Sequence, residues 1–101
     1  MKVNVSQKDI DNGKGGDGRE CPIALAVRRA FKTDDVLVLV DHEDEENEKY
    51  MYIRIDDTEE YSEKYIDKYE HVLNFIHWFD NGWWDCTTPF KFNIDTTKTT
   101  I

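Results

Sequence analysis

The stretch from Asp41 to Glu70 constrains the fold of this chain more than any other feature, because it holds thirteen acidic residues and only four basic ones. The other seventy-one residues hold nine of each, so the whole net charge of −9 arises in this one stretch. Unpaired carboxylates are costly to bury, so these side chains must stay at the surface. The expected molecule is a neutral body with an acidic flank.

The size and composition of the chain fit one folded domain. Its 101 residues are 39 % hydrophobic and 13 % aromatic, which is enough for one modest core. We therefore expect residues 1–101 to form a single domain. Cys21 and Cys86 lie far apart, and Met1 leads into polar sequence without a signal-peptide pattern, so we expect reduced thiols and a cytoplasmic protein. No apolar run reaches the roughly 20 residues that cross a bilayer.

The first third of the sequence predicts a strand, a turn of helix, a loop and a helix. Residues 2–6 alternate between polar and apolar side chains, and Ser6 is a suitable N-cap for a helical turn. Residues 13–20 contain four glycines and no apolar side chain, which predicts a loop. Pro22 favours the first turn of a short buried helix that ends near Phe31.

The middle of the sequence predicts a hairpin of two strands. Residues 36–40 are a continuous run of β-branched residues and leucine, which predicts a central strand covered on both faces. Residues 50–55 alternate, so that tyrosine and arginine side chains share one face and apolar side chains share the other. Residues 41–49 between them are too charged to pack, which predicts an acidic hairpin tip.

The last part of the sequence predicts a long helix and a final strand. Apolar residues recur with helical period from about Thr58 to Asp80, and Gly82 suits a C-terminal stop. The predicted apolar stripe consists of Tyr61, Tyr65, Tyr69, Val72, Ile76 and Phe79. Residues 90–94 alternate as a strand, and residues 96–101 predict a frayed tail. The expected fold is a small α+β domain of about four mainly antiparallel strands with one short and one long helix.

Several short segments resemble a family of small uncharacterised proteins from bacteriophages and prophages. These segments are Ile10-Asp11-Asn12-Gly13, Cys21-Pro22-Ile23-Ala24-Leu25-Ala26, Arg29-Ala30, Phe79-Asp80-Asn81-Gly82 and Pro89-Phe90-Lys91-Phe92. The resemblance supplies no activity. It implies a viral or mobile-element setting, in which small acidic proteins often block a host enzyme.

The predicted long helix carries a candidate binding surface opposite its apolar stripe. Its acids are Glu60, Glu63, Asp67 and Glu70. Successive carboxylates would lie roughly 4.5 to 6 Å apart along the axis, which is comparable with the phosphate spacing of a nucleic acid. The hairpin tip adds Asp41, Glu43, Asp44, Glu45, Glu46 and Glu48. The alternative interpretation is that this acidic face serves only solubility.

Three tryptophans are candidates for the centre of an interface. Trp78 falls on the polar side of the predicted helix, and Trp83 and Trp84 follow just beyond its end. Aromatic side chains among polar residues are typical of interface centres. The alternative is that Trp83 and Trp84 close the core.

The other candidate sites are weaker. The glycine-rich loop before Pro22 lacks the Gly-Lys-Ser/Thr ending of a phosphate loop. Cys21, at the start of the first main helix, is better interpreted as a small buried residue than as an activated thiol. His71 and His77 point to different sides of the predicted helix, and residues 41–52 lack the glycine and the final carboxylate of a calcium loop. We expect no metal and no cofactor.

Together these features predict a non-enzymatic phage-type acidic protein that inhibits a host nucleic-acid-binding protein or defence enzyme by nucleic-acid mimicry. CRISPR effectors, restriction enzymes, repair glycosylases and nucleoid proteins all present basic grooves. The acidic charge repels nucleic acid and anionic membranes, so we expect neither as a direct partner. Two alternatives remain open. One is a protein that sequesters a signalling nucleotide with the glycine loop and the tryptophans, and the other is a structural or regulatory phage protein.

Overall fold

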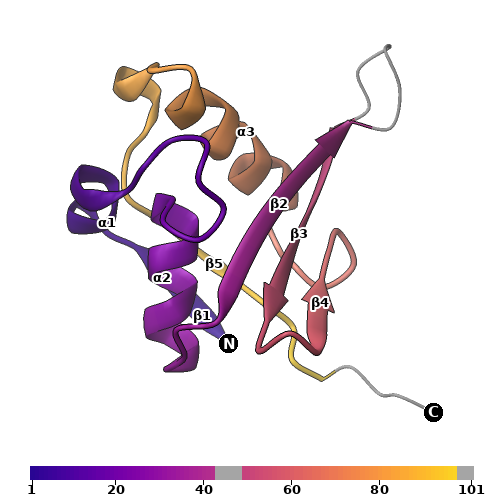
Figure 1. The fold of residues 1–101 in the computed structure, drawn as a ribbon. Coiled ribbons are helices and arrows are strands. Elements are labelled where there is room, and N and C mark those ends of the chain that lie inside the picture. Colours follow the sequence, from indigo (N-terminus) through magenta and orange to yellow (C-terminus); the bar gives the residue numbers. More distant parts are fainter. Residues whose placement is uncertain (43–48, 98–101) are drawn as a thin grey trace.

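The computed structural model describes residues 1–42 and 49–97, and the chain has an α+β fold (Figure 1). Within these residues there are two antiparallel sheets. The first pairs β1 (Lys2–Val5) with β5 (Phe90–Asn93), and the second has the order β2 (Val36–His42), β3 (Lys49–Ile55), β4 (Glu59–Tyr61). The predicted tip acids Glu43, Asp44, Glu45, Glu46 and Glu48, and residues 98–101 of the predicted tail, lie outside the described residues.

Three α-helices and one short 3-10 helix complete the described fold. They are α1 (Gln7–Asn12), α2 (Pro22–Phe31), α3 (Tyr69–Asp80) and η1 (Trp84–Cys86). In Figure 1, α1, α2 and α3 all lie on one side of the β2–β3 hairpin, with α1 and α2 next to β1 and β5. The α+β class is confirmed, although the described residues contain five strands where about four were expected.

The start of the chain folds as its local sequence predicts. The Ser6 hydroxyl accepts the backbone N–H of Asp9 (3.2 Å), and the Asp9 carboxylate accepts the backbone N–H of Ser6 (2.9 Å). This reciprocal pair is a capping box and confirms Ser6 as the N-cap of α1. Pro22 begins α2, and Phe31 ends it, as predicted.

The β2–β3 hairpin confirms the predicted strands and their alternation. Val38 pairs with Ile53, and Met51, Ile53 and Ile55 are buried. The prediction that residues 36–40 form a central strand is wrong, because β2 lies at the edge of the sheet and β3 at its centre. On β2, Val36 and Val38 of one face are buried, whereas Leu37 and Leu39 of the other face are only half-buried.

The predicted helix from Thr58 to Asp80 is wrong in its first half. Asp56 and Asp57 adopt left-handed conformations, with φ of 53° and 61°, and turn the chain back from β3 into β4. A bridge between Ile66 and Ile94 follows, and α3 begins only at Tyr69. The second half of the prediction is confirmed.

Backbone pairing explains why a strand forms where the sequence shows a helical period. Tyr61 pairs with Ile53, and the Tyr69 hydroxyl accepts the N–H of Met51 (2.7 Å) and donates to its carbonyl (3.2 Å). The edge of β3 that faces away from β2 is therefore hydrogen-bonded to β4 and to the Tyr69 side chain. A continuous helix in place of β4 would not supply the hydrogen bonds of this strand pair. Tyr61 and Tyr65 still pack together, with ring centroids 6.1 Å apart. Tyr61, Tyr65 and Tyr69, which are spaced four residues apart, thus lie in a strand, a turn and a helix.

The core lies between the two sheets and the helices. Its largest fully buried side chains include Phe75 of α3, Phe92 of β5, Ile23 of α2 and Met51 of β3. The glycine-rich loop closes one border of this core along β2, because the Gly18 carbonyl accepts the N–H of Val38 (2.8 Å). A Cβ on Gly18 would lie 2.5 Å from the Val38 carbonyl oxygen, so this close approach requires glycine.

Candidate functional site

The structure separates the four carboxylates that were predicted to form a ladder on one helix. Glu60 lies on β4, Glu63 in the turn after it, Asp67 in the connection to α3, and Glu70 in the first turn of α3. The prediction of a single helical face is therefore wrong. The regular phosphate-like spacing disappears with it, because the chain reverses direction between these residues.

Asp67 has a structural role, because it is hydrogen-bonded to Asn93 of β5. Its backbone N–H donates to the carbonyl of Asn93 (3.0 Å), and its two carboxylate oxygens accept the backbone N–H and the side-chain amide of Asn93. Burial raises the pKa of Asp67, but the hydrogen bonds from Asn93 outweigh this effect, so its pKa lies below the ordinary value. Asp67 links the start of α3 to β5 and is not a free binding group.

The outer face of the three-stranded sheet carries part of the acidic charge. Arg54 of β3 lies there with its guanidinium 3.0 Å from Glu60 and 3.8 Å from Asp57, which neutralises part of that charge. At the other end of the hairpin, Asp41 accepts a hydrogen bond from the Tyr50 hydroxyl (3.3 Å).

Glu63 and Glu70 differ from Glu60 and Asp67 in having no partner among the described residues. Both are exposed, and the described part of the structure gives neither one a hydrogen bond or an ion pair. We call Asp41, Glu60, Glu63 and Glu70 the acidic surface.

The exposed tryptophans lie beyond the end of α3. Trp83 is 53 % exposed and Trp84 is 69 % exposed. Trp78 is half-buried, and its ring centroid lies 6.1 Å from that of His71 in an edge-to-face arrangement. Trp84 borders a cavity of about 370 Å³. We call this cavity the Trp84 hollow, and its lining includes Gln7, Ile10, Asp11, Phe79, Trp84 and Thr87.

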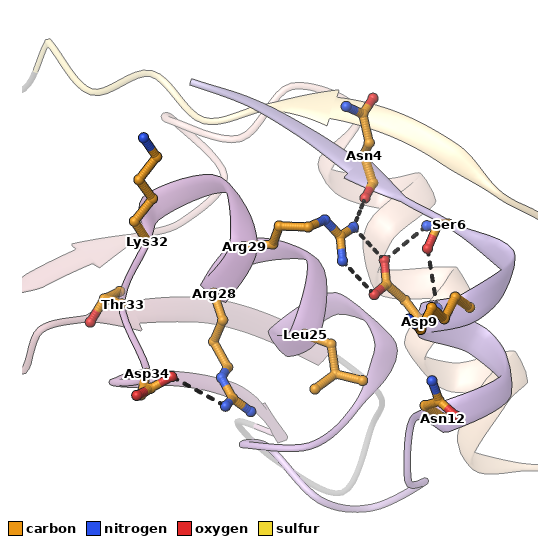
Figure 2. Close-up of a pocket in the computed structure, with 11 residues that line it drawn as sticks. Asn4, Ser6, Asp9, Asn12, Leu25, Arg28, Arg29, Lys32, Thr33 and Asp34 are labelled. Atoms are coloured by element: carbon orange, nitrogen blue, oxygen red, sulfur yellow. Dashed lines mark hydrogen bonds and ion pairs between the residues drawn. The ribbon is translucent and has the colours of Figure 1, made fainter.

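A wider groove of about 850 Å³ lies along α1 and α2, and the sequence did not indicate it (Figure 2). Arg29 of α2 crosses this groove. Its guanidinium donates to both carboxylate oxygens of Asp9 (2.8 and 2.7 Å) and to the carbonyl of Asn4 (2.8 Å). Burial raises the pKa of Asp9, but the hydrogen bonds from Arg29 and Ser6 bring it below the ordinary value. The ion pair therefore joins α2 to α1 and β1.

The lining of this groove carries more positive than negative charge, because Lys8, Arg28, Arg29 and Lys32 face only Asp9 and Asp34 among the described lining residues. Arg28 lies 3.5 Å from Glu20 and 3.4 Å from Asp34. Lys8 and Lys32 also line the groove. Arg28 and Arg29 are paired with carboxylates of the chain itself, whereas the described residues give Lys8 and Lys32 no ion pair.

The glycine-rich loop uses its backbone within the fold. The carboxylate of Asp17 accepts the N–H groups of Arg19 (3.0 Å) and Glu20 (3.2 Å), and Asp80 accepts the N–H of Gly16 (2.9 Å). Carboxylates thus occupy the donors that a phosphate loop would offer to its ligand. Cys21 after the loop is buried, as predicted, and burial raises the pKa of its thiol to about 11.

No group of three or more His, Cys, Asp or Glu side chains within residues 1–42 and 49–97 is arranged to hold a metal ion. Among the same residues, none of the helices combines the length and the apolar composition that a bilayer crossing requires. Comparisons of the chain with models of protein families, with curated proteins and with solved structures find no match.

Proposed function

We propose that this chain is a non-enzymatic binding protein of phage type that inhibits a host nucleic-acid-binding protein or defence enzyme by occupying its basic groove. One observation carries the proposal: the whole net charge of −9 arises in residues 41–70. The acidic surface belongs to this segment, and its members Glu63 and Glu70 are exposed without a described partner. Such a surface attracts a basic groove and repels nucleic acid.

The proposed inhibition works through charge complementarity over an irregular surface. The carboxylates come from β2, β4, a turn and the start of α3, so they do not repeat at the spacing of phosphates along a strand. A fixed repeat is not needed to exclude nucleic acid, because a bound acidic protein fills the groove and repels the competing phosphates. Binding of this kind weakens as salt is added.

The proposal that the chain sequesters a signalling nucleotide has less support. Gly13 of the glycine loop and Trp84 do border the same hollow. Among the described residues, Asp11 is the charged residue of this lining, which contains no lysine or arginine. A carboxylate without a cation disfavours the phosphate groups of a nucleotide.

A capture experiment tests the proposed function. The purified protein is immobilised and exposed to a nuclease-treated bacterial lysate, and bound proteins are released either with salt or with duplex DNA. We expect nucleic-acid-binding proteins to be retained at low salt and displaced by either agent. Retention at about 1 M salt, or simultaneous binding of DNA and this chain by a captured protein, would exclude mimicry.

Two variants assign the binding to the acidic surface. Glu63→Gln with Glu70→Gln removes two exposed charges, and we expect affinity for the captured partner to fall about tenfold. Glu20→Gln with Asp34→Asn removes two charges beside α2 and serves as the matched control. An equal loss of affinity in both variants would mean that only net charge matters, and no loss in either would leave solubility as the role of the acids.

A further inference from the structure

Trp84 is an exposed indole on a hydrogen-bonded turn. The Trp84 carbonyl accepts the backbone N–H (3.0 Å) and the hydroxyl (2.8 Å) of Thr87, which is itself buried. The N–H of Cys86 donates to the Trp83 carbonyl (3.0 Å). The backbone that carries Trp84 is therefore already ordered before a partner binds.

The Trp84 hollow combines an apolar floor with one carboxylate. Ile10 and Phe79 are each 8 % exposed and lie among its lining residues. Asp11 receives one hydrogen bond, from the side-chain amide of Gln7 to Oδ1 (2.9 Å), and the described residues give it no ion pair. A second cavity of about 460 Å³ lies beside Trp84 and is lined by Asp85. Each of the two cavities that Trp84 lines thus includes an acid, and the described residues place no lysine or arginine in either lining.

We propose that the Trp84 hollow binds the guanidinium group of an arginine side chain from a basic protein partner. A guanidinium is flat and weakly hydrated, so it stacks on an indole and at the same time donates to a carboxylate such as Asp11. The aliphatic part of the arginine side chain covers Ile10 and Phe79. An anionic ligand is disfavoured by Asp11 and Asp85.

Trp83 is less suited to this role, although it is the neighbouring residue. Its ring packs edge-on against His77, with centroids 5.5 Å apart. Trp83 shares the second cavity with Trp84, but it does not line the Trp84 hollow. The two adjacent tryptophans therefore provide a variant and its matched control within one turn.

This inference rests on the proposed function in one respect, because the proposed function supplies the basic protein to which the arginine belongs. The hollow can be tested without that partner, by titration with an oligoarginine peptide and with an oligolysine peptide of equal length. Tryptophan fluorescence gives the affinity, and the indole N–H signals in NMR spectra identify the tryptophan that responds. We expect oligoarginine to bind about three- to fivefold more tightly than oligolysine, with the Trp84 indole shifting most.

Trp84→Ala should abolish the preference for oligoarginine over oligolysine, and Asp11→Asn should reduce this preference. The control variant Trp83→Ala should leave the preference unchanged. Glu63→Gln with Glu70→Gln should weaken both peptides equally and leave the preference intact, which separates failure of the acidic surface from failure of the hollow. Equal affinity of the wild-type protein for both peptides would overturn the inference. The inference would also be overturned if the indole N–H signal of Trp78 or Trp83, and not that of Trp84, shifted most when oligoarginine is added. This measurement uses the wild-type protein, so it does not require any variant to fold.

Discussion

At the residue scale, the pair of Asp9 and Arg29 is the tightest ion pair in the described structure. The Asp9 side chain is 5 % exposed and accepts two bonds from Arg29, while Arg29 also holds the Asn4 carbonyl. A carboxylate at this depth depends on its partners, because burial alone would favour the neutral acid. The Arg29 side chain thus joins α2 to the two consecutive elements β1 and α1.

Replacing Asp9 with Asn should destabilise the protein by about 1 to 3 kcal/mol, because it weakens the capping box and leaves Arg29 without its counter-ion. Urea unfolding measures this change, and Asp11→Asn on the exposed side of α1 is the control. The pKa of Asp9 is lowered on folding, so its stabilisation is present above the ordinary value of 3.8 and is lost as pH falls through the lower folded value. The difference between wild type and variant should therefore shrink below about pH 4, and a constant difference would contradict this account.

At the element scale, the start of α3 is fixed by its neighbour β5 and not by a helix cap of its own. Lys68 at the N-cap has a left-handed φ of 53° and makes no capping bond with its side chain. Its ammonium group instead donates to the Lys91 carbonyl (3.0 Å), and the preceding Asp67 binds Asn93. The two residues before α3 both anchor it to β5.

Asp67→Ala should therefore lower the free energy of unfolding by about 1 to 2 kcal/mol, since two hydrogen bonds from Asn93 lose their acceptor. The backbone amide of Asn93 should also exchange faster with solvent in NMR hydrogen-exchange experiments. Glu63→Ala removes an exposed carboxylate from the same connection, and it should neither lower the free energy of unfolding nor speed exchange at Asn93. Unchanged exchange at Asn93 in the Asp67 variant would show that the link is dispensable.

At the scale of the whole molecule, charge is segregated between a neutral part and an acidic one. The net charge of −9 lies within residues 41–70, and Arg54 is the one arginine of that stretch. Like charges that share one region repel one another in the compact state. The free protein therefore carries an electrostatic cost that a basic partner would relieve.

Moderate salt should raise the melting temperature of the free protein, because screening weakens this repulsion over distances of about 10 Å at 0.1 M. Calorimetry between about 0.02 and 0.2 M NaCl measures the effect. Glu63→Gln with Glu70→Gln should melt higher than wild type at low salt and should respond less to added salt. A melting temperature that falls with salt would mean that the ion pairs of Arg54 and Arg29 outweigh the repulsion.

The sequence by itself determined those elements whose signals are local. The Ser6 cap, the proline that begins α2, the alternation of residues 50–55 and the buried stripe of α3 each depend on residues within a few positions of one another. The burial of Cys21 followed from its place at the start of an apolar helix.

Only the tertiary structure decided which partner each segment finds. The tyrosine spacing before α3 fits a helix, but the unpaired edge of β3 recruits Tyr61 as a strand residue instead. An apolar run such as residues 36–40 does not reveal whether strands lie on both of its sides, and here β2 is an edge. Arg29 binds Asp9 across twenty positions, and Asp11 of α1 and Trp84 of η1 line the same hollow. Such contacts depend on chain reversals, which no local period encodes.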